Sequence, residues 1–117
     1  IGSDGYPVPL WNLKTGEVDR SAVAYARDHG YDITAYLKQN WAAVGPKLVN
    51  KIHVYVGDMD SFYLNLGVYG LEDFMKSTKN PHYAGTFDYG RPEKPHGWNG
   101  GMTQDQVLRQ IYAAVRQ

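Results

Sequence analysis

Three side chains suited to acid–base catalysis stand in two short stretches of the chain. Asp58 and Asp60 lie in KLVNKIHVYVGDMDSFYLNL (residues 47–66), and His96 lies in GRPEKPHGWNGG (residues 90–101). A carboxylate that binds one nitrogen of a histidine fixes the tautomer in which the other nitrogen accepts a proton. An acid followed along the chain by a histidine is also the order of the last two members of a Ser, Asp, His triad.

The same residues permit a second kind of chemistry. A D-x-D pair at the end of a strand can bind a divalent cation, with His96 or Asn65 as a further ligand. Hard cations usually require more carboxylates than this stretch carries. The alternative is therefore a small non-catalytic or divalent-metal-binding α/β domain that uses Asp58, Asp60 and His96.

The two stretches are each preceded by a strand pattern. Residues 52–56 alternate β-branched side chains with His53 and Tyr55, and such short apolar runs are usually buried on both faces of a sheet. Residues 83–89 place Tyr83, Phe87 and Tyr89 on one side, which indicates a second strand.

A helix is predicted between these strands. It begins near Asn65 and ends before Lys79-Asn80-Pro81-His82. Strand, helix and strand in this order predict a parallel βαβ unit whose strands end at the same sheet edge. The acids and His96 are therefore expected to lie side by side. The helix carries one apolar stripe, formed by Leu64, Val68, Leu71, Phe74 and Met75.

Residues 1–44 form an arm and a helical excursion, and residues 45–117 carry the βαβ segment. Asp19 and Asp32 are expected to cap two helices, the second of which should end at Gly45-Pro46. A capping box that starts at Thr103 begins a C-terminal helix, which we expect to pack against the sheet.

The composition excludes several functional classes. The chain has 117 residues, of which 43% are hydrophobic and 21% charged, with no net charge and no cysteine. No basic patch suggests a nucleic-acid partner, and no long apolar run or cationic amphipathic stretch suggests a membrane. A thiol nucleophile and a thiolate metal site are impossible, and no cofactor is indicated.

These stretches resemble part of a known superfamily. KIHVYVGDMDSFYL, YAGTFDYG and KPHGWNG are similar to the C-terminal part of α/β-hydrolases, in particular bacterial esterases of the esterase D and enterochelin-esterase-like kind. The resemblance covers residues 45–117. It implies a serine esterase with a small-molecule ester substrate.

The resemblance also implies roles for single residues. The catalytic acid falls on Asp60 and the catalytic histidine on His96, with Asp58 as the alternate acid. Trp98, in the histidine loop, is expected either to line the pocket for the acyl or leaving group or to anchor the loop.

One part of the triad is missing from the pattern. No G-x-S-x-G elbow occurs, and none of the serines lies on a strand-to-helix elbow: Ser3, Ser21, Ser61 and Ser77. Two parallel strands alone leave unpaired edges. The sequence therefore predicts a partial α/β unit from the C-terminal part of a serine hydrolase. We expect it to be inactive alone and to associate with a second copy or with the missing N-terminal part.

Overall fold

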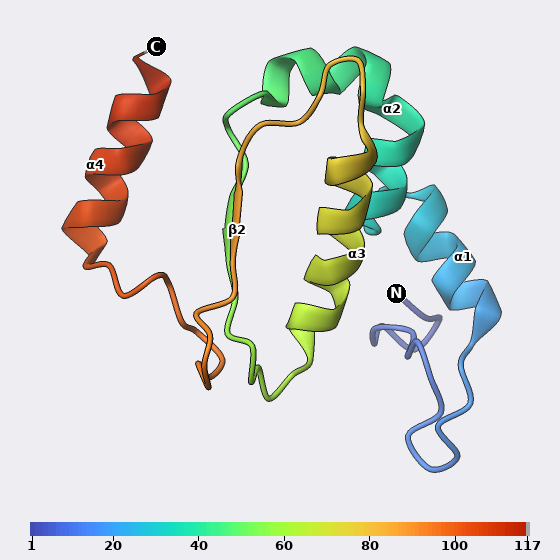
Figure 1. The fold of residues 1–117 in the computed structure, drawn as a ribbon. Helices are drawn as coiled ribbons and strands as arrows, with labels where there is room; N and C mark the ends of the chain where they lie inside the picture. The colour runs from blue at the N-terminus through green and yellow to red at the C-terminus, as the bar shows by residue number, and fades with distance from the viewer. Residues whose placement is uncertain (117) are drawn as a thin grey trace. The chain divides into compact units, whose positions relative to one another are not determined.

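The computed structural model describes residues 1–116 and divides at residue 41 into two compact units. The division lies three residues before the boundary expected at residue 44. None of the helices in the described part of the chain is long and apolar enough to cross a membrane. The elements in chain order are α1 (Arg20–Asp28), α2 (Ile33–Leu48), β1 (His53–Tyr55), α3 (Leu64–Ser77), β2 (Thr86–Asp88) and α4 (Gln104–Val115) (Figure 1).

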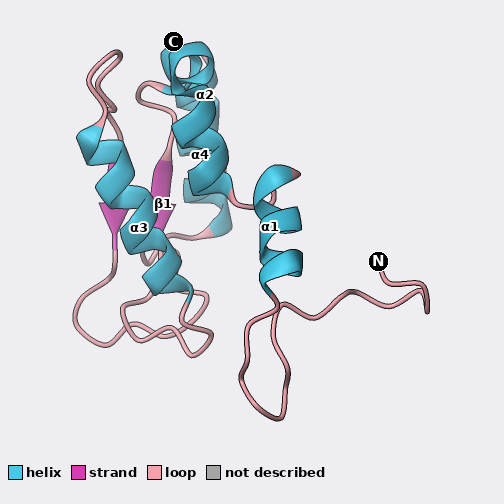
Figure 2. Ribbon diagram, turned by 90° about the vertical axis from the view of Figure 1, so that its right-hand side faces the viewer, coloured by secondary structure: helices cyan, strands magenta, loops and turns pink. Residues whose placement is uncertain are grey.

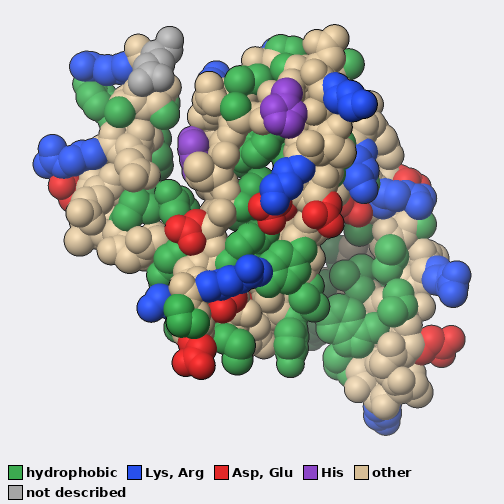
Figure 3. Space-filling view, viewed as in Figure 1, with side chains coloured by type: hydrophobic (Ala, Val, Ile, Leu, Met, Phe, Trp, Pro, Cys, Tyr) green, Lys and Arg blue, Asp and Glu red, His purple; other side chains and the backbone are tan. Residues whose placement is uncertain are grey.

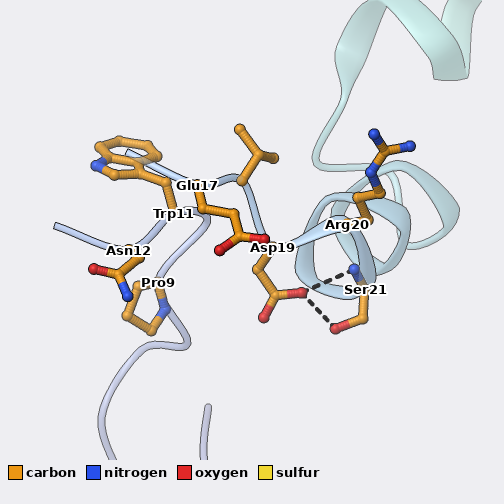
Figure 4. A pocket seen from close by; sticks show the side chains of 8 residues that line it. Pro9, Trp11, Asn12, Glu17, Asp19, Arg20 and Ser21 are labelled. Carbon is orange, nitrogen blue, oxygen red and sulfur yellow. Dashed lines mark hydrogen bonds between the residues drawn. The ribbon is translucent and has the colours of Figure 1, made fainter. Parts of the chain in front are cut away.

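The first unit contains a short hairpin and α1. Trp11 and Val18 form an isolated antiparallel bridge. Asp19 then caps α1, as predicted, by accepting hydrogen bonds from the backbone N–H groups of Ser21 (2.9 Å) and Ala22 (3.1 Å). A pocket of about 570 Å³ opens between the hairpin and this first helical turn (Figure 4). The Asp19 carboxylate also accepts from the Ser21 hydroxyl, so the helix cap already uses it.

The helix α2 begins as predicted and ends later than predicted. The Asp32 carboxylate accepts a hydrogen bond from the Ala35 N–H group at 2.9 Å, which confirms the cap. The expected end at Gly45-Pro46 is wrong, because the helix runs through Pro46 to Leu48. A proline removes one backbone donor, and so close to the end of a 16-residue helix it does not break the turns before it.

The βαβ prediction is confirmed. The strands β1 and β2 are parallel, with His53 opposite Thr86 and Tyr55 opposite Asp88. Each strand is three residues long and therefore shorter than expected. Tyr83, which was expected in the second strand, lies before it. Its N–H group donates to the Thr78 hydroxyl, and its own hydroxyl donates to the Ile52 carbonyl. The chain is thus a mixed helical protein with a small parallel sheet, a partial α/β unit.

The helix α3 covers one face of this sheet. Figure 2 shows α3 in front of the strands. Met75 on α3 is fully buried, and Val56 is 8% exposed. The Tyr89 hydroxyl donates to Glu72 of α3 at 2.6 Å, which places Tyr89 and the residues that alternate with it on the α3 side.

The other face of the sheet is open, so the prediction of a strand buried on both faces is wrong. This face carries His53, Thr86 and Asp88, all exposed. The capping box at Thr103 forms as predicted, but α4 buries no side chain. The expected packing of α4 on the sheet is also wrong, because a groove of about 1150 Å³ separates them (Figure 3).

Candidate acid–histidine site

The loops that follow the two strands lie against each other at one edge of the sheet. The Asp58 N–H group donates to the Tyr89 carbonyl at 2.9 Å, and the Met59 N–H group donates to the Lys94 carbonyl at 3.0 Å. Met59 also forms a parallel bridge with Pro95. The predicted meeting of the segments after β1 and after β2 is therefore present.

Gly57 allows this close approach. Gly57 is buried, and a Cβ atom there would overlap the carbonyl oxygens of Lys94 and Pro95. Any larger residue would push the histidine loop away from the acid segment. This requirement explains the glycine directly after the strand.

Asp58 fastens the histidine loop through its carboxylate. One oxygen accepts a hydrogen bond from the Lys94 N–H group at 2.7 Å, and the other accepts from the Glu93 N–H group at 3.2 Å. The Lys94 bond is the main reason why the pKa of Asp58 lies below its ordinary value. Asp58 therefore acts on the backbone of the loop, two residues before His96.

Asp60 is the acid that meets the histidine. Its Oδ2 atom lies 3.0 Å from Nδ1 of His96, and its side chain is 2% exposed while that of His96 is 47% exposed. Its Oδ1 atom accepts a hydrogen bond from the Phe62 N–H group at 2.7 Å. With Nδ1 donating to the carboxylate, the ring takes the tautomer whose Nε2 accepts a proton.

The pKa of Asp60 reflects two opposed influences. Burial of the carboxyl group is the largest and raises the pKa. Hydrogen bonds from His96 and from the backbone N–H groups of Phe62 and Leu64 together outweigh it, so the pKa lies below the ordinary value. Asp60 is thus a carboxylate at neutral pH. The Nε2 atom of His96 has no hydrogen-bond partner within residues 1–116, so it is free to accept a proton.

The start of α3 supports the acid segment. The Tyr63 N–H group donates to the Asp60 carbonyl at 3.0 Å, and Tyr63 has a left-handed backbone, with φ of 58°. Asn65 is buried, and its amide Nδ2 donates to the Asp58 carbonyl at 3.3 Å. Asn65 therefore holds the backbone of the D-x-D segment through its amide nitrogen, while its buried Oδ1 atom has no hydrogen-bond partner within residues 1–116.

Trp98 lies at the open face of the sheet. Its ring meets that of Tyr55 edge to face, with centroids 6.1 Å apart, and it lines the groove beside α4. A Cβ atom at Gly90 would also touch the Trp98 ring. These contacts are those of a loop anchor, and the lining of the groove that contains Trp98 includes neither Asp60 nor His96.

No metal centre and no nucleophile accompany the pair in the described residues. Within residues 1–116, no group of three or more His, Asp or Glu side chains is placed to hold a metal ion. Both oxygens of Asp58 accept bonds from backbone N–H groups. No serine hydroxyl of this part of the chain forms a hydrogen bond with His96.

Phe62 belongs to the site and was missed by the sequence reasoning. Its ring centroid lies 4.7 Å from that of His96, and the planes make an angle of 69°. A usable signal was present, because an aspartate side chain often accepts a hydrogen bond from the N–H group two residues later. The ring contact with a residue of another loop had no sequence signal.

Comparisons of the chain with models of protein families, with curated proteins and with solved structures found no match. What the site offers is an ionised buried carboxylate joined to a half-exposed imidazole.

Proposed function

We propose that the chain supplies the acid and the general base of a serine esterase of the α/β-hydrolase kind. The observation that carries the proposal is the 3.0 Å hydrogen bond in which His96 Nδ1 donates to Asp60 Oδ2. The acid is buried, the ring is exposed, and both lie at the carboxyl edge of parallel strands. In open α/β sheets, active sites and ligand-binding sites lie at this edge. The order of acid and histidine along the chain is that of the triad in α/β-hydrolases.

The chemistry assigned to the pair is acyl transfer. A serine oxygen attacks the ester carbonyl carbon, and His96 Nε2 takes the serine proton. When the bond to the alcohol oxygen breaks, Nε2 returns that proton to the leaving alcohol. Water then attacks the acyl-enzyme with His96 again as base and releases the acid and the serine. Asp60 holds the tautomer and stabilises the imidazolium formed in each half of the reaction.

The serine and the oxyanion hole come from a part of the protein outside this chain. The Thr86 N–H group donates to the Ile52 carbonyl, and the Val56 N–H group donates to the Asp88 carbonyl. Alternate residues of β1 therefore turn their backbone groups toward β2. His53 and Tyr55 therefore turn their backbone groups to the free edge. We assign that edge to a strand of the N-terminal part of the protein or, in the isolated chain, to a second copy. A monodisperse monomer that unfolds cooperatively would contradict this assignment.

The gene segment before the Ile1 codon provides the test. We expect an open frame with a G-x-S-x-G elbow, and we expect the longer protein to hydrolyse p-nitrophenyl esters. Asp60→Asn should lower kcat about 10⁴-fold, because a wrongly held tautomer cannot take the serine proton. Asp58→Asn is the matched control and should cost far less. A frame that lacks the elbow, or equal losses in the two variants, would contradict the proposal.

A further inference from the structure

We propose that Phe62 is a positioning residue that fixes the plane of the His96 imidazole. The inference rests on the proposed function, because the orientation of the ring matters to catalysis only if His96 acts as the base. Its evidence is separate, since it comes from the ring contact and from the exposure of Phe62.

A single hydrogen bond does not fix an imidazole. The bond from Nδ1 to Asp60 holds one ring atom, and rotation of the ring about its Cβ–Cγ bond carries Nδ1 away from the carboxylate. The His96 side chain is 47% exposed, and the residues from Arg91 to Gly97 around it are all exposed, so the loop provides no wall of packed side chains. A second contact on the ring is needed to aim Nε2.

Phe62 provides that contact. The 4.7 Å distance between the ring centroids and the 69° angle between the planes describe an edge-to-face pair. Such pairs are preferred over stacked ones and have a defined geometry. The Phe62 ring therefore restricts the rotation of the imidazole that would break the hydrogen bond to Asp60.

The same residue also fixes the acid. The Phe62 N–H group donates to Oδ1 of Asp60 at 2.7 Å, while Oδ2 of the same carboxylate accepts from His96. The backbone of Phe62 thus orients the carboxylate, and its ring orients the imidazole. One residue links both members of the pair.

Core packing does not explain where Phe62 lies. Phe62 is 68% exposed, whereas the other two phenylalanines, Phe74 and Phe87, are half-buried beside the sheet. Its side chain could be shortened with little loss of buried area. A large apolar ring held in the open beside the histidine is consistent with a role in the site.

The test measures the His96 tautomer in the isolated chain by ¹⁵N NMR, at a pH where the imidazole is neutral. We expect the wild type to show Nδ1 protonated, and Phe62→Leu to lower the ratio of this tautomer to the other about two- to tenfold, the range set by edge-to-face ring pairs. Phe62→Tyr keeps a ring and should restore the ratio. Tyr63→Leu removes a neighbouring exposed ring and is the matched control. His29, His53 and His82 report on the rest of the fold.

The outcomes separate this inference from the proposed function. If Asp60→Asn changes the ratio and Phe62→Leu does not, the hydrogen-bonded pair exists and Phe62 does not position it. If Tyr63→Leu changes the ratio as much as Phe62→Leu, the effect is not specific to the contact and the inference fails. If neither Asp60→Asn nor Phe62→Leu changes it, the pair itself is absent in solution and the proposed function fails as well.

Discussion

The carboxyl edge of the sheet and its open face differ in how they are held. At the edge, backbone and side-chain hydrogen bonds join the segment around Asp58 to the loop before His96. On the face toward α4, a groove separates the exposed strand residues from the helix, and no side chain of α4 is buried. An acid–histidine pair can therefore be held by local bonds between two loops, even where the sheet behind it has only two short strands.

The largest expected change in the free energy of unfolding comes from a substitution on α3, and a substitution on α4 should change it little. Met75→Ala should lower the free energy of unfolding by about 2–5 kcal/mol, because it leaves a cavity in place of the fully buried Met75 side chain on α3. Leu108→Ala, on α4, is the matched control: Leu108 is 63% exposed and should lose little. Urea unfolding followed by circular dichroism measures both. Similar losses would mean that α4 packs as firmly as α3.

A smaller effect is expected at the edge. Gly57→Ala should lower the free energy of unfolding by about 1–3 kcal/mol, because the new methyl group meets the carbonyls of Lys94 and Pro95. Gly67→Ala is the control, since a Cβ atom there meets nothing within 4 Å and alanine favours the helix. It should stabilise by about 0.5–1 kcal/mol. An unchanged stability in Gly57→Ala would show that the two loops are not in contact.

The smallest effect is the pH dependence of the Asp58 bonds. Because the folded state lowers the pKa of Asp58 below 3.8, its contribution to stability is present above that pH and is lost as the pH falls through the folded value. The stability difference between wild type and Asp58→Asn should therefore be larger at pH 7 than at pH 3. Urea midpoints at the two pH values measure it. An equal difference at both would show that the ionised carboxylate does not hold the loop.

Sequence patterns predicted the parts of the fold that local rules decide. The caps at Asp19, Asp32 and Thr103 follow from side chains that satisfy free N–H groups at helix starts. The parallel βαβ order placed Asp60 and His96 at one edge, because a helix between two strands forces that topology.

The rest depended on interactions that no local pattern contains. The different tasks of Asp58 and Asp60 are set by which groups of the other loop come within reach: Asp58 meets backbone N–H groups, and Asp60 meets the His96 ring. The prediction that α4 covers the sheet assumed that this helix finds a partner surface in the same chain, but α4 buries no side chain. The ring contact of Phe62 likewise joins residues 34 positions apart in sequence.

The most direct test of the central claim is an NMR observation of the His96 ring in the isolated chain, compared with Asp60→Asn and Asp58→Asn. We predict a proton on Nδ1 and none on Nε2 in the neutral wild-type ring, loss of this preference in Asp60→Asn, and its retention in Asp58→Asn. A wild-type ring with the proton on Nε2, or one that responds to Asp58→Asn and not to Asp60→Asn, would contradict the assignment of Asp60 and His96 as an acid–base pair.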